Sequence, residues 1–268
     1  MPAGISEKTI KDYIVYLQER PNKKVKTKLL GERTIAGYIN SLRVILYYFM
    51  KKGYVNPFSI EIPKANKKVR ETYTESEIEQ LLVKPDLKKC RFSEYRNWVI
   101  INYLLATANR KSTVRQLKIR DLNFEDDEIT LRTVKNKRPY TIPMDKRLKK
   151  ILIEYLNYRK GNPEEYVFCP ESDSSKPLTK SGLASAISIY NTKREVSKKT
   201  CHIFRNYFAK HYLLKGGPQA SLMKILGHKT LHMVLEYVDM CGEDLKVGFN
   251  DYNPLRDFAK SERVKMRK

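Results

Sequence analysis

Apolar residues recur at helical spacing along most of this chain, and the period changes only at residues 123–143. Ile35, Ile39 and Leu46, for example, lie on one stripe of a helix that we expect from about residue 32 to 52. Residues 123–143 instead contain two short runs of alternating apolar and polar positions, which is typical of paired strands. The pattern therefore predicts a mainly α-helical fold with a small β-hairpin or sheet.

Turn and linker signals divide the chain into two parts. Asn56-Pro57 marks a turn, and Ile62-Pro63 begins a linker. We expect a small helical domain over residues 1–68, a larger domain over 69–250 and a basic tail over 251–268. The length of 268 residues leaves room for two domains of ordinary size. By its composition alone, the tail is typical of a frayed terminus.

The charge balance is strongly basic, because 53 Lys and Arg residues against 30 Asp and Glu residues give a formal net charge of +23. Such an excess predicts a polyanionic partner. Nucleic acid is favoured over a membrane, since no segment has a large apolar face flanked only by Lys and Arg. Phosphate contacts supply most of the nonspecific affinity for DNA. The candidate contacts are Lys23, Lys24, Lys26, Lys28, Arg43, Lys64, Lys67, Lys68, Lys137, Arg138, Lys198 and Lys199. A solvated basic surface is the alternative interpretation.

The four cysteines, Cys90, Cys169, Cys201 and Cys241, are far apart and form no Cys-x-x-Cys pair. They are typical of reduced thiols in an intracellular protein rather than of a zinc site or a disulfide framework. The N-terminus has no apolar signal core, and no apolar run approaches membrane-spanning length. We therefore expect a cytoplasmic protein that does not bind membranes.

One stretch, residues 201–237, contains all four histidines of the chain. It holds His202 and Arg205 in the pattern His-x-x-Arg, then Leu-Gly-His ending at His228, then Tyr237 nine residues later. Residues three apart share a helix face, so His202 and Arg205 can point at one spot. Fixed cationic donors and a nearby phenol suit phosphate chemistry. Taken singly, each residue is more often an ordinary core or surface residue.

The combination resembles the C-terminal active-site block of the tyrosine recombinase (phage integrase) family. The first catalytic Arg of that family lies in a Thr-Gly-x-Arg-x-Ser-Glu pattern, and residues 107–113 read Thr-Ala-Asn-Arg-Lys-Ser-Thr. Arg110 matches, whereas Ala108 replaces the glycine and Thr113 replaces the acid. The family also has a hairpin Lys eight residues before a Pro. Lys135 precedes Pro143 by eight, with Lys137 and Arg138 as competing candidates.

The resemblance implies that Tyr237 attacks a DNA phosphate, forming a 3′-phosphotyrosine and releasing a 5′-hydroxyl. The 5′-hydroxyl of a second strand then attacks this intermediate, which exchanges strands through a Holliday junction. A phenol has an ordinary pKa near 10, so it needs a base at neutral pH, and His202 is the candidate.

The remaining residues of the pattern take supporting roles under the same resemblance. Arg110 and Arg205 would hold the phosphate oxygens, and His228 would donate a further hydrogen bond. Lys135 would protonate the leaving 5′-oxygen. The arginines supply the charge that a divalent cation supplies elsewhere, so we expect no metal and no cofactor.

The whole chain fits the resemblance in order. Residues 1–68 resemble the SAM-like core-binding domain of the family, and the length resembles its short, Xer-type architecture. The implied partners are double-stranded DNA, three further copies in a homotetramer on two DNA sites, and accessory proteins. The tail at 251–268 would dock on a neighbouring subunit. Integration or excision of a mobile element and resolution of dimers remain equally open.

Two other functions compete with this one. A type IB topoisomerase-like enzyme would use the same chemistry to relax DNA, although the short N-terminal module argues against it. A repurposed DNA-binding protein that no longer cleaves is the second alternative, and the Thr113 departure gives it some weight. Formation of a covalent DNA adduct separates both enzymes from the DNA-binding protein.

Overall fold

The computed structural model describes residues 5–22, 28–66, 71–132 and 139–238. The chain forms two compact units, residues 1–69 and 70–268, and each is described by itself. Among the described ranges, no helix combines the length and the apolar character needed to cross a membrane. The expected mainly α-helical fold with a small antiparallel sheet is confirmed.

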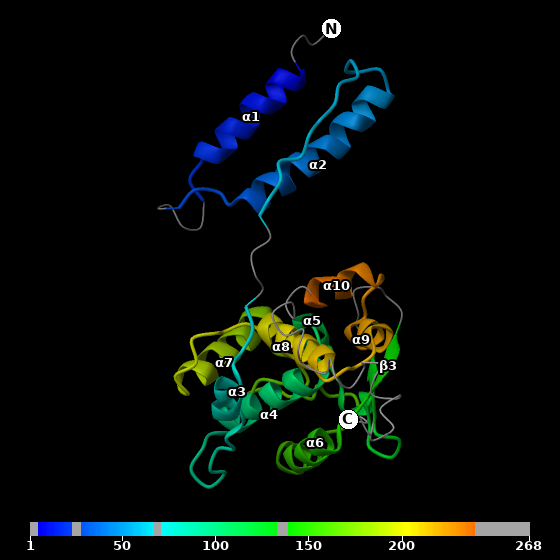
Figure 1. The fold of residues 1–268 in the computed structure, drawn as a ribbon. Helices are drawn as coiled ribbons and strands as arrows, with labels where there is room; N and C mark the ends of the chain where they lie inside the picture. Colours follow the sequence, from blue (N-terminus) through cyan, green and yellow to red (C-terminus); the bar gives the residue numbers. More distant parts are fainter. Residues whose placement is uncertain (1–4, 23–27, 67–70, 133–138, 239–268) are drawn as a thin grey trace, which may run out of the picture. The chain divides into compact units, whose positions relative to one another are not determined.

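The described part of the smaller unit has two helices that lie side by side, α1 (Glu7–Glu19) and α2 (Glu32–Lys51) (Figure 1). Their facing stripes bury an apolar core, as the helical periodicity predicts. Ile60, in the segment that follows α2, packs into this core. The buried core residues are Ile10, Leu17, Ile35, Ile39, Leu46 and Ile60.

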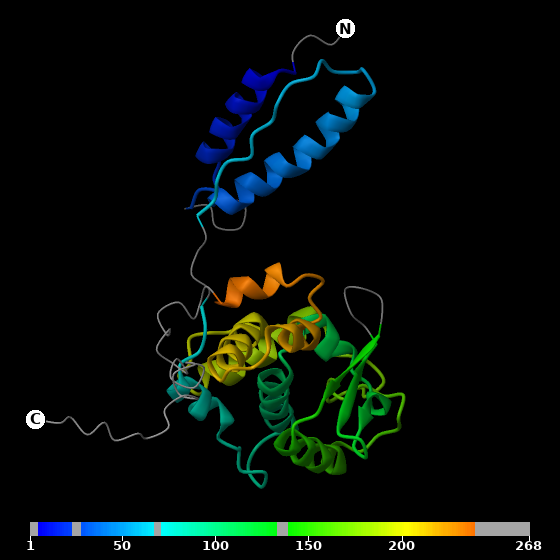
Figure 2. The same ribbon diagram turned by 45° about the vertical axis from the view of Figure 1, so that its right-hand side comes forward.

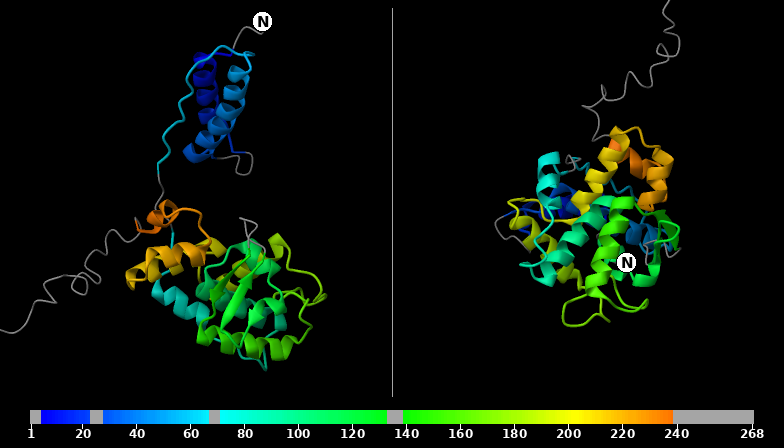
Figure 3. Two further views of the ribbon diagram at one scale, coloured as in Figure 1. Left: turned by 90° about the vertical axis from the view of Figure 1, so that its right-hand side faces the viewer. Right: turned by 90° about the horizontal axis from the view of Figure 1, so that it is seen from below.

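The larger unit is a helical assembly with one small sheet. Its helices are α3 (Glu75–Leu82), α4 (Phe92–Thr107), α5 (Lys111–Gln116), the 3₁₀ turn η1 (Ile119–Asp121), α6 (Lys146–Arg159), α7 (Lys180–Thr192), α8 (Cys201–Leu214), α9 (Gln219–Leu226) and α10 (His232–Val238). Figures 2 and 3 show the sheet at one side of these helices.

The sheet has the order β1-β2-β3 and is antiparallel throughout, with β1 (Leu122–Asn123), β2 (Glu128–Leu131) and β3 (Tyr140–Pro143). Ile129 pairs with Ile142, and both are buried on the core face. The β2–β3 hairpin confirms the alternation in the sequence. The two-residue strand β1 was not expected, because two positions are too few to show a period of two.

Helix α4 forms the centre of the larger core. Val99, Ile100 and Ile101 are fully buried, and α4 packs against α6, α7 and α8. Such burial on several sides explains why α4 is apolar around most of its surface. The helix ends at Ala108, which adopts the left-handed conformation with φ of 53°. This sharp end turns the chain directly into Arg110.

Helix α3 begins with the capping box that the Thr-x-x-Glu pattern predicts. The amide of Thr74 donates to Glu77 at 2.8 Å, and the amide of Glu77 donates to the Thr74 hydroxyl at 3.2 Å. Lys198 also pairs with the Glu77 carboxylate. Burial would raise the pKa of Glu77, but the hydrogen bonds from Lys198 and Thr74 outweigh it and lower the pKa below 4.5.

Replacing Glu77 with Gln should therefore destabilise the larger unit by about 1 kcal/mol at neutral pH. Because the folded-state pKa of Glu77 is depressed, its contribution is complete above the unfolded pKa and is lost as the pH falls through the folded value. Thermal melts at pH 7 and at about pH 3 should show a difference that shrinks in acid. Glu75→Gln, an exposed change in the same turn, is the control. Equal melting temperatures of wild type and Glu77→Gln at pH 7 would contradict this account.

Candidate active site

Four elements of the larger unit bring the motif residues to one region. Arg110 is the N-cap residue of α5, and His202 and Arg205 lie one turn apart in α8. His228 follows the glycine that ends α9, and Tyr237 lies in α10. Helix α10 packs across α8 and also contacts α9 (Figure 2). Residues separated by more than 120 positions in the sequence therefore share one site.

Arg205 is at the centre of the site and is 3% exposed. Its guanidinium donates to the Ala108 carbonyl at 3.0 Å, to the Leu226 carbonyl at 2.7 Å and to Nε2 of His228 at 2.7 Å. Burial lowers the pKa of Arg205 and the charge of Arg110 lowers it further, whereas the phenol of Tyr237 acts in the opposite direction. These contacts fix the guanidinium as a rigid charged group.

The C-terminal end of α9 holds both arginines. Arg110 donates to the Leu226 carbonyl at 3.3 Å, the same oxygen that accepts from Arg205. The last carbonyls of a helix lack partners within the helix and carry partial negative charge. This helix end therefore compensates two like charges that would otherwise repel each other in a partly buried site.

His228 and Tyr237 lie with their rings nearly parallel, 6.0 Å apart between centroids and at 15°. A guanidinium can only donate, so Nε2 of His228 accepts from Arg205 and carries no proton in this arrangement. Tyr237 is 1% exposed and packs with Ala108, at the end of α4, and with Leu222 and other buried residues of α8 to α10. The phenol is thus held inside the protein beside the charged centre.

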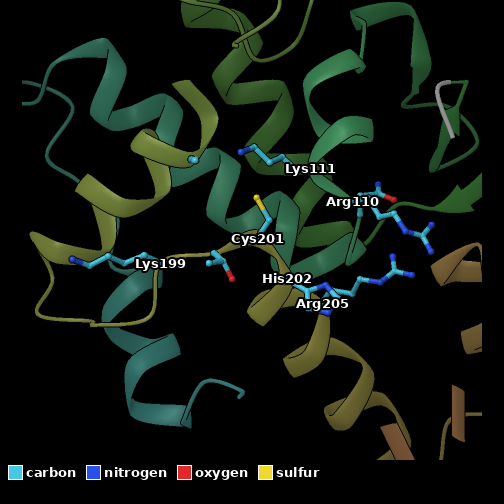
Figure 4. A pocket seen from close by; sticks show the side chains of 9 residues that line it. Arg110, Lys111, Lys199, Cys201, His202 and Arg205 are labelled. Carbon is cyan, nitrogen blue, oxygen red and sulfur yellow. The ribbon is translucent and has the colours of Figure 1, made fainter. Parts of the chain in front are cut away.

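His202 is exposed beside a cavity of about 330 Å³, whereas Arg205, which also lines this cavity, is buried. Two arginines and two lysines are among the residues that line this cavity. In Figure 4, Arg110 and Arg205 extend to the same side, and Lys111 and Lys199 extend away from them. The lining residues are Asn109, Arg110, Lys111, Ala184, Lys199, Thr200, Cys201, His202 and Arg205. A cavity of this charge and size suits an anionic group such as a phosphate.

Cys201 is the thiol in the wall of this cavity. Burial raises the pKa of its thiol to about 11, and the charge of Lys111 only partly opposes this. The thiol therefore stays protonated at neutral pH and is a poor nucleophile. In the described part of the chain, no three His, Cys, Asp or Glu side chains gather in a way that could hold a metal ion.

Ala108 stands where the family pattern has a glycine, and its conformation shows why glycine suits the position. Its φ of 53° lies in the left-handed region, which costs a non-glycine residue roughly 1–2 kcal/mol. The carbonyl of Ala108 accepts from Arg205, so the strained turn contributes directly to the site. Thr113, at the position of the family acid, is buried in α5.

The candidate DNA contacts differ in their surroundings. Lys28, Lys64 and Lys199 are exposed, and Arg43 is half-buried and donates to Asn40. Lys198 is half-buried and paired with Glu77, so its ammonium already has a carboxylate partner. These roles in DNA binding stay predictions. Outside the described residues lie Lys23, Lys24, Lys26, Lys67, Lys68, Lys135, Lys137, Arg138 and the tail at 251–268.

Two side chains beside the site were not predicted from the sequence. Lys111 lines the cavity, and Tyr140 on β3 lies next to the end of α9. The strand alternation contained a signal for Tyr140, because Tyr140 shares the inward face with the buried Ile142. For Lys111 there was no comparable signal, since surface lysines are common in this basic chain.

A comparison with known families gives a match over most of the larger unit. Residues 71–242 match the profile of the phage integrase family. The chain belongs to this family. The matched region spans α3 to α10, so it contains all the elements that form the candidate site described above.

Curated relatives within the phage integrase family extend over nearly the whole chain. The tyrosine recombinase XerD of Staphylococcus haemolyticus is 26% identical, with 94% of each protein covered. The tyrosine recombinase XerA of Pyrococcus furiosus is 27% identical, with 97% of this chain and 93% of the relative covered. Similarity at this level therefore includes the smaller unit as well as the larger one.

Solved structures show the same fold. The XerH site-specific recombinase, in a post-cleavage complex with a palindromic difH substrate, superposes with a TM-score of 0.72 at 19% identity, covering 93% of this chain and 73% of that one. The Tn1549 transposon integrase, in a complex with a circular intermediate DNA, superposes with a TM-score of 0.70 at 18% identity, covering 91% and 86%.

Proposed function

We propose that this protein is a site-specific DNA recombinase that cleaves and rejoins strands through a 3′-phosphotyrosine at Tyr237. The observation that carries the proposal is the position of the Tyr237 phenol beside Arg205 and His228 of its own chain. Neutral surroundings would suffice for a merely structural tyrosine. A phenol placed beside a buried arginine and a histidine suits attack on a phosphate.

The first step is a transfer of the phosphoryl group from one oxygen to another. The Tyr237 oxygen bonds to phosphorus, the bond from phosphorus to the 5′-oxygen breaks, and the 5′-oxygen leaves as a hydroxyl after taking up a proton. His202, in the cavity wall, is the base proposed to accept the phenol proton, and Lys135 is the proposed proton donor. The reverse reaction with a new 5′-hydroxyl rejoins the strands, so no external energy source is required.

The two arginines stabilise the charge that develops on the phosphate oxygens. Arg205 and Arg110 are already oriented by the Leu226 carbonyl, so little reorganisation is needed when the phosphate binds. In the same state, Nε2 of His228 accepts from Arg205. His228 can therefore donate to a phosphate only through Nδ1, or after this hydrogen bond has been exchanged.

Access of DNA to the nucleophile requires a movement of the protein. Tyr237 is 1% exposed, so a phosphodiester cannot reach its oxygen while α10 is packed on α8 and α9. We propose that DNA binding displaces α10 or rotates the phenol into the cavity. A buried nucleophile protects the free protein from unproductive reactions.

Strand exchange between two duplexes requires more than one protomer. We propose a homotetramer on two DNA sites, with double-stranded DNA as the partner and the tail at 251–268 docked on a neighbouring subunit. The formal net charge of +23 favours this DNA partner through counterion release. The proposal includes a cytoplasmic location and accessory proteins that set direction, and it covers integration, excision and dimer resolution alike.

The test is a nicked suicide duplex built from sites selected by binding out of a random DNA library. Cleavage near the nick releases a short fragment carrying the 5′-hydroxyl, which diffuses away and traps the covalent complex. With the retained strand labelled at its 5′ end, wild-type protein should give a protease-sensitive, slowly migrating band on a denaturing gel, also in the presence of EDTA. Tight binding without this band would favour a DNA-binding protein that does not cleave.

A further inference from the structure

Within the described ranges, three side chains donate to the C-terminal end of α9, and two of them belong to the motifs. Arg110 and Arg205 donate to the carbonyl of Leu226. The third, Tyr140, reaches across from β3, and its hydroxyl donates to the carbonyl of Ile225 at 3.4 Å. The sheet and the arginine pair thus hold adjacent carbonyls of one helix end.

Tyr140 is also in close contact with Gly227, the residue between Leu226 and His228. A Cβ placed on Gly227 would lie 2.6 Å from the Tyr140 oxygen and 3.1 Å from Cζ of the ring. Gly227 has φ of 59°, a left-handed conformation that ends α9 and directs His228 back toward Arg205. The Tyr140 side chain therefore packs against the turn that places His228.

The electrostatic surroundings keep Tyr140 a hydrogen-bond donor. Burial raises the pKa of its phenol, and the charges of Arg205 and Arg110 only partly oppose this. The hydroxyl is therefore protonated at neutral pH. It can donate to the α9 carbonyl, and it does not compete with Tyr237 as a nucleophile.

We propose that Tyr140 is a positioning residue for DNA cleavage. Its hydroxyl and ring hold the end of α9, and this end in turn holds Arg110 and Arg205 through Leu226 and directs His228 to Arg205. The inference rests on the proposed function, because it assigns Tyr140 a role in that reaction. Tyr140 acts through these groups and does not itself touch the phosphate.

The expected effect is modest, because the bond from Tyr140 is long and neutral. A hydrogen bond of this kind changes an equilibrium by roughly two- to tenfold. Tyr140→Phe keeps the ring against Gly227 and removes only the donor. The rate of single-turnover cleavage at saturating protein should fall by about three- to tenfold, with the DNA dissociation constant and the final amount of adduct unchanged.

The matched control is Tyr190, a buried tyrosine of α7 that is not among the residues lining the cavity. Its hydroxyl donates to the carbonyl of Leu81 at 3.0 Å, near the C-terminal end of α3. Tyr190→Phe removes the same type of bond from the same type of helix end. It should lower the melting temperature and leave the cleavage rate unchanged.

The outcomes separate the inference from the proposed function. A slower rate for Tyr140→Phe alone, with unchanged adduct amplitude, supports positioning. A wild-type cleavage rate in Tyr140→Phe overturns the inference and leaves the recombinase function intact. The same holds if Tyr190→Phe loses as much rate as Tyr140→Phe does. It also holds if Tyr140→Phe forms less adduct without a change in rate. Absence of any adduct with wild type overturns the proposed function and the inference with it.

Discussion

Replacing Tyr237 with Phe should abolish the covalent DNA adduct and leave DNA binding at its wild-type level. The ring that packs parallel to His228 is kept, so the site should retain its shape. The oxygen that attacks the phosphate is lost, and removal of a nucleophile typically lowers turnover by roughly 10⁴-fold or more. The measurement is the denaturing gel with the nicked suicide duplex, together with a binding titration on the intact site.

A second tyrosine from the same cluster gives the control for Tyr237→Phe. Tyr212 of α8 is partly buried in the cluster that contains Tyr237, so Tyr212→Phe changes the same residue type in a similar environment. It should form adduct like wild type. An adduct from Tyr237→Phe would show that another residue is the nucleophile, and loss of DNA binding in this variant would indicate that the change disturbs the fold.

The sequence predicted which residues meet in the site, but it did not predict their burial or the groups that orient them. The motif spacing indicated that Arg205 and His202 share a helix face, yet Arg205 is 3% exposed and His202 is exposed beside the cavity. The difference depends on α9 and α10, which cover Arg205. Packing between segments that are far apart in the chain produces no periodic pattern of residues, so the sequence did not predict it.

The groups that orient the arginines are backbone carbonyls, and these have no residue type that a motif could specify. The oxygens of Ala108 and Leu226 accept from Arg205 only because α4 and α9 end where they do.

Lys198 has a partner that the sequence did not indicate. Its basic cluster indicated phosphate contact, but its ammonium pairs with Glu77, 121 positions earlier in the chain. Charge counting does not detect such a partner.

Replacing Arg205 with Lys should lower the cleavage rate by about 10²–10³-fold, the usual effect of losing one oxyanion-stabilising donor. The charge is conserved, but an ammonium carries its donors on one atom and cannot reproduce the planar fork in which two guanidinium nitrogens reach three acceptors. Arg110 donates to the same Leu226 carbonyl, so its orientation beside the phosphate would also be disturbed. The rate should be measured in single turnover at saturating protein, so that weaker DNA binding does not contribute.

A buried arginine outside the site separates this catalytic effect from a general loss of stability. Arg96 of α4 is 7% exposed and donates to the carbonyl of Cys169 and to the side chain of Asn97. Arg96→Lys should therefore lower the melting temperature about as much as Arg205→Lys does, because each leaves buried acceptors without a partner. Its cleavage rate should stay within about threefold of wild type, since a surface or core change away from the reacting groups leaves transition-state contacts intact. Equal rates for the two variants would mean that Arg205 supports only the fold, and the charged centre of the reaction would then have to be Arg110 alone.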